Sequence, residues 1–252
     1  MIWQFINTGP HRGRFNMDYD LELVKNFSGS PILRLYQWKP YCISLGANQD
    51  YNSVDQKKTS ADGFEIIKRP TGGRAIFHAE ELTYSVVYPI TKEFSPKRIY
   101  LEINLALKNG LINYDPVFSE IELKNSQPHF PSFYKDSKSS LCFAVSAKNE
   151  LNFHGKKVVG SAQRKIGEVI LQHGSILCGS YHKNVVNYLN LPLDEFEMIK
   201  AEINETTTEL ETILEKMINY TQLASSIGVG FESHFNISFE EEKIEESISL
   251  AN

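Results

Sequence analysis

The segment GKKVVGSAQRKIGEVILQHGSIL, residues 155–177, says most about how the chain folds. It contains two apolar runs, 156–161 and 168–177, that are rich in Val, Ile and Leu, as β-strands are. The connection between the two runs is short enough for a hairpin. Small residues at 160–162 would leave room for a ligand to lie against the first strand. The segment therefore predicts paired strands with space for a ligand beside them.

Similar strand-like runs occur along the rest of the chain, at 31–38, 41–46, 64–69, 81–89 and 148–153. Helical periodicity occurs at 16–27, 95–112 and 205–225. Ser95 and Pro96 stand where an N-cap and a first helical residue are expected. Because strands outnumber helices and many lie within hairpin distance, we predict an α+β fold, a mixed or antiparallel β-sheet flanked by helices. The Pro-, Ser- and Lys-containing segment 125–140 predicts a long loop.

The composition limits the class of protein. The chain has 252 residues with ordinary soluble composition, which is enough for one large core. Its three cysteines contain no C-x-x-C pair, so we expect neither a disulfide framework nor a zinc site. The N-terminus lacks a signal-peptide pattern, and no apolar run could span a bilayer. We therefore expect a cytoplasmic protein with no membrane partner.

Charge argues against one class of partner. The formal net charge is −5, so nucleic-acid binding is not expected. The acidic C-terminal sequence FEEEKIEES is interpreted as solvated surface. Basic residues gather instead within 148–165, and Lys156, Arg164 and Lys165 among them could meet an acidic protein.

The motif KRPTGGRAIFH, residues 68–78, has two adjacent glycines between strand-like runs. Adjacent glycines permit positive φ and let backbone N–H groups approach a ligand. A glycine hairpin turn is the simpler explanation, but a plain turn does not need Lys68, Arg69, Arg74 and His78 around it. The nucleotide-binding pattern G-x-x-x-x-G-K-[ST] is absent from the chain.

Three further residues each have a structural and a functional interpretation. Lys157 is either a solvent-facing lysine on an edge strand or a charged group beside a ligand. His173 is either a satisfied core histidine or a site residue. Cys142 is either a small buried hydrophobe or a nucleophile, and its position between a polar loop and a basic strand favours the nucleophile.

Taken in order, KRPTGGRAIFH, LTYSV, CF, GKKVVGSAQRK and LQHGSIL resemble the biotin/lipoate protein ligase superfamily, and SLGANQ at 44–49 fits as well. The resemblance is strongest to its cysteine-dependent octanoyl-acyl-carrier-protein:protein N-octanoyltransferases of lipoate synthesis. It implies a biotin/lipoate ligase-like catalytic domain over 15–210, with 211–252 as a helical, acidic extension of the same unit. The family often has two arginines where this chain has Lys68-Arg69. Arg74 stands where ATP-using ligases usually carry a third glycine, which favours the transferase.

The resemblance assigns roles to individual residues. It makes Cys142 the catalytic nucleophile and Lys157 its electrostatic partner. The TGG loop, the K-x-x-G-S-A strand and the H-G strand would form one acyl tunnel. The residues implied to line the substrate site are Arg69, Thr71, Gly72, Gly73, His78, Gly160, Ser161, Ala162, His173 and Gly174. Cys42 and Cys178 match no family position and are interpreted as core thiols.

The implied chemistry is acyl transfer in two steps. The donor would be an octanoylated acyl carrier protein, and the acceptor a lysine of a lipoyl domain or of the glycine-cleavage H protein. Thioester exchange is nearly energy-neutral and amide formation is downhill, so no ATP, metal or other cofactor is expected. The alternatives are an ATP-dependent lipoate ligase that would not need Cys142, an amidotransferase between lipoyl-domain proteins, and a non-catalytic binding module that keeps the pocket.

Overall fold

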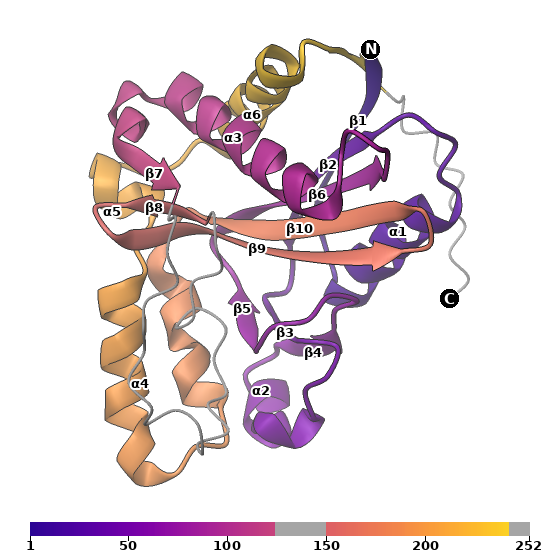
Figure 1. Ribbon diagram of the computed structural model, residues 1–252. Coiled ribbons are helices and arrows are strands. Elements are labelled where there is room, and N and C mark those ends of the chain that lie inside the picture. The colour runs from indigo at the N-terminus through magenta and orange to yellow at the C-terminus, as the bar shows by residue number, and fades with distance from the viewer. Residues whose placement is uncertain (124–149, 242–252) are drawn as a thin grey trace.

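The structure is a computed structural model that describes residues 1–123 and 150–241 (Figure 1). Cys142 and the predicted loop 125–140 lie outside the described residues. An eight-stranded sheet runs through this part of the chain in the order β11-β1-β2-β6-β10-β9-β8-β7. Its strands are β1 (Ile2–His11), β2 (Ile32–Trp38), β6 (Glu81–Pro89), β7 (Ile121–Leu123), β8 (Leu151–Phe153), β9 (Lys156–Ile166), β10 (Val169–Leu177) and β11 (Ser238–Glu241).

The sheet is mixed, as the sequence predicts. β1 pairs in parallel with both β11 and β2, whereas every other pairing in this sheet is antiparallel. β9 and β10 form the hairpin predicted over 156–177, with Ile176 opposite Val159 and Val169 opposite Ile166. A second sheet in the described chain has the order β4-β3-β5, built from β3 (Cys42–Leu45), β4 (Glu65–Lys68) and β5 (Ile76–His78).

α3 (Pro96–Tyr114) and α6 (Tyr220–Phe235) cover one face of the large sheet, whereas α1 (Gly13–Lys25) and the small sheet lie on the other (Figure 1). The helices are α1 (Gly13–Lys25), α2 (Gln56–Ala61), α3 (Pro96–Tyr114), α4 (Leu193–Thr206), α5 (Leu210–Leu214) and α6 (Tyr220–Phe235). α3 and α6 pack on each other over one face, where alternate strand residues such as Leu33, Val86 and Ile170 join their core. The residues adjacent to these in each strand, Ile32, Val87 and Leu171, pack on the other face against α1.

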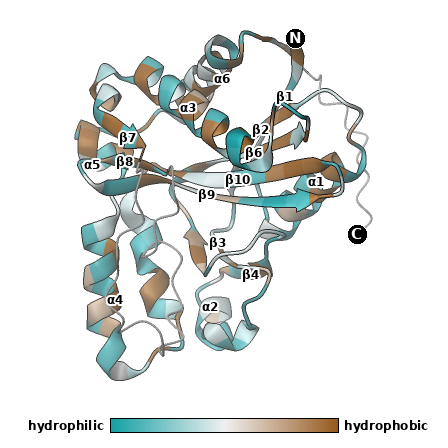
Figure 2. Ribbon diagram, in the orientation of Figure 1, coloured by the Kyte–Doolittle hydropathy of each residue, from teal (hydrophilic) through white to brown (hydrophobic). Residues whose placement is uncertain are grey.

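Apolar side chains concentrate between these layers. Figure 2 shows brown, hydrophobic segments along β10 and on α3 and α6, with teal segments between them on the helices. The chain from position 210 onward contributes to the main core, which includes Leu210, Leu223, Ile227 and Phe231. In the described chain no helix is both long and apolar enough to cross a membrane.

Two predicted helices are confirmed in place. The pattern over 16–27 falls on α1, which ends at Lys25, and the pattern over 95–112 falls on α3. The Ser95 hydroxyl accepts a hydrogen bond from the Arg98 amide, and Pro96 is the first helical residue, so both have their predicted positions.

The prediction of one helix over 205–225 is wrong. α4 ends at Thr206 because the next residues extend alongside β9 and pair with it. α5 is short and is followed by Glu215, which has left-handed backbone with φ 51°. α6 begins after Asn219, whose side chain accepts a hydrogen bond from the Gln222 amide and caps a new helix. Tertiary pairing and local capping thus divide a pattern that has helical periodicity throughout.

Candidate active site

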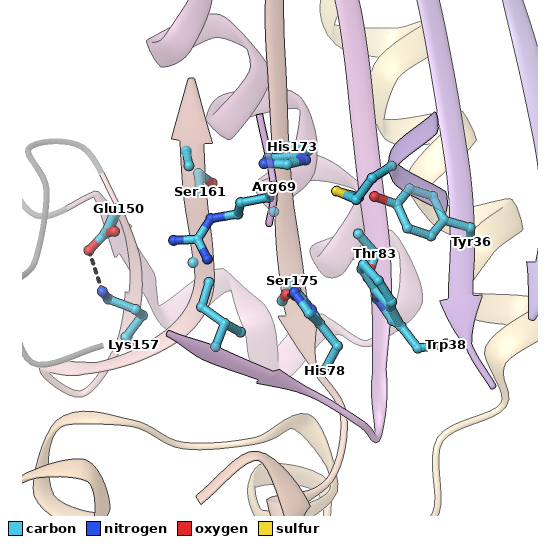
Figure 3. A pocket seen from close by; sticks show the side chains of 15 residues that line it. Tyr36, Trp38, Arg69, His78, Thr83, Glu150, Lys157, Ser161, His173 and Ser175 are labelled. Carbon is cyan, nitrogen blue, oxygen red and sulfur yellow. Dashed lines mark hydrogen bonds and ion pairs between the residues drawn. The ribbon is translucent and has the colours of Figure 1, made fainter. Parts of the chain in front are cut away.

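A cavity lies between the large sheet and the small sheet, with about 490 Å³ of empty space including its open mouth. Figure 3 shows it as a row of side chains, with Glu150 and Lys157 at one end and Tyr36, Thr83 and Trp38 at the other. Most of its lining surface is apolar. The lining residues are Met17, Tyr36, Trp38, Arg69, Ile76, His78, Thr83, Glu150, Lys157, Gly160, Ser161, Ala162, His173, Gly174 and Ser175.

Strand alternation explains why polar groups meet here. Successive side chains of a strand point to opposite faces, so residues two apart share a face. On β2, β6 and β10 the face toward α1 begins with apolar residues and turns polar toward the cavity. The buried polar residues of that face are Arg34, Tyr36, Glu81, Thr83, Ser85, His173 and Ser175. The large sheet therefore supplies a polar floor, and the small sheet closes over it.

Arg69 fixes the TGG turn beside the cavity. Its buried guanidinium donates hydrogen bonds to the carbonyl oxygens of Gly72 and Arg74 at 3.0 and 2.7 Å, and to that of Ser44 at 2.9 Å. Gly73 has φ +96°, which favours glycine. Arg69 thus ties backbone carbonyls of the TGG turn to strand β3.

The SLGANQ and TGG turns touch through their backbones. The amide of Ala47 donates to the carbonyl oxygen of Thr71 at 2.9 Å. A Cβ atom added to Gly46 would collide with the carbonyl oxygen of Gly73. Two motifs that are separate in the sequence therefore form one structure beside the cavity.

His173 connects the TGG turn to the sheet. Its Nε2 lies 2.6 Å from the Thr71 hydroxyl, and its Nδ1 lies 3.7 Å from a carboxylate oxygen of Asp20. Burial lowers the pKa of His173 and favours the neutral imidazole. Burial would raise the pKa of Asp20, but the charge of Arg34 and the contact with His173 bring it below its usual value. His173 is therefore held on both ring nitrogens.

His78 has a similar second network. Its Nδ1 lies 2.8 Å from the Glu81 carboxylate and its Nε2 lies 2.7 Å from the Ser44 hydroxyl. The Trp38 ring stacks on the imidazole with centroids 4.0 Å apart, and its Nε1 donates to Thr83 at 2.7 Å. Burial opposes the charge of Glu81, yet the neighbouring His78 keeps the pKa of Glu81 below its usual value. These hydrogen bonds and the ring stacking hold the side chains in place at this end of the cavity.

Lys157 is buried in the cavity wall and does not face solvent. Its side chain is 2% exposed, and its Nζ lies 2.9 Å from Oε2 of Glu150, which is also buried. The interpretation of Lys157 as a solvent-facing lysine is therefore wrong. A buried ammonium costs several kcal/mol of desolvation unless it is paired, so Glu150 accounts for its presence here.

The backbone of Lys157 is held on both sides. On one side it lies opposite Asn152 of β8. On the other side β10 has already ended, and Thr207 takes the place of a neighbouring strand. The amide of Thr208 donates to the Lys157 carbonyl oxygen at 3.0 Å. The ammonium therefore projects from a strand that is fixed at this residue.

The structure brings most of the predicted site residues to this one cavity. Those that line it are Arg69, His78, Gly160, Ser161, Ala162, His173, Gly174 and Lys157. Thr71, Gly72 and Gly73 do not line it but form the turn that Arg69 and His173 hold. Cys142 lies outside the described residues, so its place is not defined. Cys42 and Cys178 are fully buried, and burial raises the pKa of both thiols.

Sequence reasoning missed several cavity residues. Glu150 stands two residues before Asn152, which lies opposite Lys157. In the sequence, the one indication of its role was that an acidic residue interrupts the strand-like run KNELNF. Asp20 and Glu81 are likewise carboxylates within otherwise apolar patterns. Tyr36 and Trp38 gave no signal, because aromatic residues in a strand indicate a core equally well.

The arrangement combines an apolar slot with a fixed buried ammonium at one end. Such a site suits a ligand with an apolar chain and a reacting group that becomes negative. Within residues 1–123 and 150–241, no three His, Cys, Asp or Glu side chains are placed to share a metal ion.

Comparison with known proteins identifies the family. The model of the lipoyl protein ligase A/B catalytic domain matches residues 12–232, which is most of the chain. The chain belongs to this family. Its curated relatives include proteins named octanoyltransferase LipM. The protein from Staphylococcus epidermidis is 31% identical over 94% of this chain and 88% of its own length. The one from Macrococcus caseolyticus is 38% identical over 69% of this chain and 65% of its own length.

Solved structures agree on the fold. A bipartite lipoate protein ligase from Thermoplasma acidophilum matches with a TM-score of 0.76 and 20% identity, over 98% of this chain and 88% of that one. Lipoate-protein ligase A bound with ATP matches with a TM-score of 0.75 and 18% identity, over 98% and 90%. The fold is thus that of the lipoate ligases, and the named relatives identify this family member as an acyltransferase.

Proposed function

We propose that this family member transfers an octanoyl group in lipoate synthesis, from octanoyl-acyl carrier protein to a lysine of a lipoyl domain or of the glycine-cleavage H protein. Cys142 carries the group as a thioester between the two proteins. The observation that carries the proposal is the buried ammonium of Lys157 at one end of an apolar cavity. The names of the relatives support the octanoyl group.

The dimensions of the cavity suit an octanoyl chain. Its lining comes from β2, β6, β10 and β9, which are neighbours in the sheet. Neighbouring strands lie about 4.8 Å apart, so the lining extends roughly 14 Å across the strands. An extended chain of eight carbons, with bonds of about 1.5 Å, is roughly 9 Å long. The lining thus spans more than the length of an octanoyl chain, which supports a position with the carbonyl near Lys157 and the chain end toward Tyr36 and Trp38.

In the first step the Cys142 thiolate attacks the donor thioester. The C–S bond of the enzyme thioester forms, and the carrier protein leaves as a thiolate. In the second step the neutral amine of the acceptor lysine attacks, the amide bond forms as the C–S bond breaks, Cys142 is released as a thiolate, and the proton lost by the amine nitrogen passes to solvent. Each step passes through a tetrahedral intermediate with a negative oxygen, which the Lys157 ammonium stabilises. The same charge favours the thiolate of Cys142.

Intact-mass analysis after mixing the protein with octanoyl-acyl carrier protein, without ATP, tests the proposal. We expect one added octanoyl mass that hydroxylamine removes, since hydroxylamine cleaves thioesters. An adduct that forms only with free octanoate and ATP would identify an ATP-dependent ligase. An adduct that forms only from an octanoylated lipoyl domain would identify an amidotransferase. Absence of any adduct would contradict a covalent intermediate.

The acidic donor and acceptor are proposed to dock at Lys156, one of the basic residues of β9. The structure separates these residues. Lys156 is exposed at the start of the strand and donates to the carbonyl oxygen of Asn204, whereas Arg164 donates to that of Pro70 at the far end. Eight residues of strand span about 26 Å, so Lys156 and Arg164 do not form one patch. Lys156, which adjoins Lys157, is the one nearest the proposed chemistry.

Transfer at limiting donor is therefore expected to slow as salt rises, because screening weakens steering by complementary charge. Lys156→Glu should lower kcat/KM several-fold and reduce the salt dependence, with little change in kcat. Lys165→Glu makes the same charge change at the exposed far end of β9 and is the matched control. Initial-rate assays at low and high salt measure kcat/KM and its salt dependence for both variants. Equal rates at all salt concentrations would indicate that these residues are only solvated surface.

A further inference from the structure

Glu150 is the acidic group closest to the proposed chemistry, and neither the motifs nor the family resemblance assigns it a role. It lies just before β8, is 4% exposed and lines the same cavity as Lys157. Figure 3 shows the two side chains pointing toward one another at the end of the row. The neighbouring core positions, Leu151 and Val159, are apolar, so the carboxylate stands out at this end of the sheet.

An irregularity in the sheet aims Glu150 at Lys157. Leu151 lies opposite Val159, but the next residue, Asn152, lies opposite Lys157, so Val158 is an extra residue in β9. Such a bulge re-aims side chains locally and is frequent beside active sites. Because residues two apart share a face, Glu150 and Asn152 project to the side that Lys157 shares. The ion pair of 2.9 Å follows from this register.

Among the described residues, two phenols also lie near Glu150. Tyr84 of β6 and Tyr100 of α3 both feel its charge. Burial, opposed by two hydrogen bonds, raises the pKa of Tyr84 to about 12, and Glu150 adds to the shift. Burial followed by the charge of Glu150 raises the pKa of Tyr100 as well. Glu150 is therefore the negative charge that balances the Lys157 ammonium within the described cavity wall.

We propose that Glu150 is the positioning residue of the acyl-transfer site, which keeps Lys157 charged and fixed at the end of the cavity. The inference rests on the proposed role of Lys157. An ammonium that is 2% exposed loses most of its hydration, and without a counter-charge burial favours the neutral amine. A neutral amine stabilises neither a thiolate nor an oxyanion. Glu150 thus contributes to catalysis only through Lys157.

The first test is the pH dependence of transfer in Glu150→Gln. The amide keeps the shape and can still accept a hydrogen bond, but it removes the counter-charge. We expect kcat at pH 8 to fall at least about tenfold, with KM for the donor little changed. The loss should shrink as pH falls, because protonation restores the ammonium. Glu150→Asp keeps the charge and should recover the wild-type shape of the profile at a lower kcat. Glu122→Gln, on the exposed edge strand β7, is the matched control and should behave as wild type.

A second measurement does not depend on the proposed function. Cyanate carbamylates neutral amines and not ammonium groups, so its reaction with Lys157, quantified by peptide mass spectrometry, reports the charge directly. We expect carbamylation of Lys157 at pH 8 to be several-fold faster in Glu150→Gln than in wild type. Exposed Lys156 in the same peptide region provides the internal reference.

Equal carbamylation of Lys157 in both proteins, including no reaction in either, would overturn the proposal. So would a Glu150→Gln profile that is lowered equally at every pH, because a merely structural residue would have that effect. If wild type transferred no octanoyl group but the difference in carbamylation remained, the proposed function would fail while the role of Glu150 stood.

Discussion

Replacing Lys157 with alanine is expected to lower octanoyl transfer by about a hundredfold to a thousandfold, the usual effect of removing one group that stabilises a developing oxyanion. The structure strengthens this expectation, because the ammonium is buried at the end of the cavity where its charge is weakly screened. Lys157→Arg should also transfer poorly, since a planar guanidinium does not fit the place of a compact ammonium beside Glu150. Single-turnover assays with octanoyl-acyl carrier protein measure the loss.

The fold should survive the change, but at a cost in stability. Thr207, Thr208 and Asn152 hold the backbone at this position, so the strand remains. Removing the ammonium takes the 2.9 Å ion-pair partner away from the buried Glu150 carboxylate, a loss that costs about 3–5 kcal/mol. The double variant Lys157→Ala with Glu150→Gln should regain most of that stability in thermal unfolding and none of the activity. Near-normal turnover in Lys157→Ala would mean that the lysine does not act in catalysis.

Replacing Cys142 with alanine is expected to abolish both the covalent octanoyl adduct and the transfer. A thiol of ordinary pKa, about 8.5, is only a few per cent ionised at neutral pH, and a nearby ammonium increases that fraction. Cys142→Ser should trap little or no octanoate, because an alkoxide is far harder to form than a thiolate. Intact-mass analysis and acceptor octanoylation, measured on the same samples, separate formation of the intermediate from its use.

The other two cysteines provide the control. Cys42 and Cys178 are buried, and burial raises the pKa of each thiol, so neither is suited to attack a thioester. Cys178→Ala should therefore still form the adduct and transfer the octanoyl group. Transfer by Cys142→Ala, or transfer that requires ATP, would identify the chain as a ligase and Cys142 as a bystander.

Local signals predicted the parts of the fold that local interactions determine. The cap at Ser95 and the hairpin over 156–177 depend on neighbouring residues, and both are present. The break after Thr206 depends on pairing with a strand some fifty residues earlier, which no periodicity reveals. Strand β11 was hidden for the same reason: its acidic sequence indicated solvated surface, yet Phe239 pairs with Trp3 of β1.

The candidate site was predictable where residues form motifs. The glycine-rich turn, the lysine strand and the histidine strand meet at one cavity, as their ordered appearance in the sequence suggested. The groups that hold them were not predictable. Asp20 reaches His173 because α1 packs on the sheet, and Glu150 reaches Lys157 through the register of β8 and β9 and one bulge. A charged residue within an apolar run was the sole local indication, and many such residues are ordinary surface.

The contact between Gly46 and Gly73 has a consequence for how this enzyme could change its specificity. Position 46 cannot gain a side chain while the TGG turn keeps its place, because a Cβ there would occupy the position of the Gly73 carbonyl oxygen. Substitution at position 46 alone is therefore not tolerated, and glycine should return there in nearly every functional clone of a directed library. New substrates would have to be accommodated by residues on the strands, while the paired turns are inherited together.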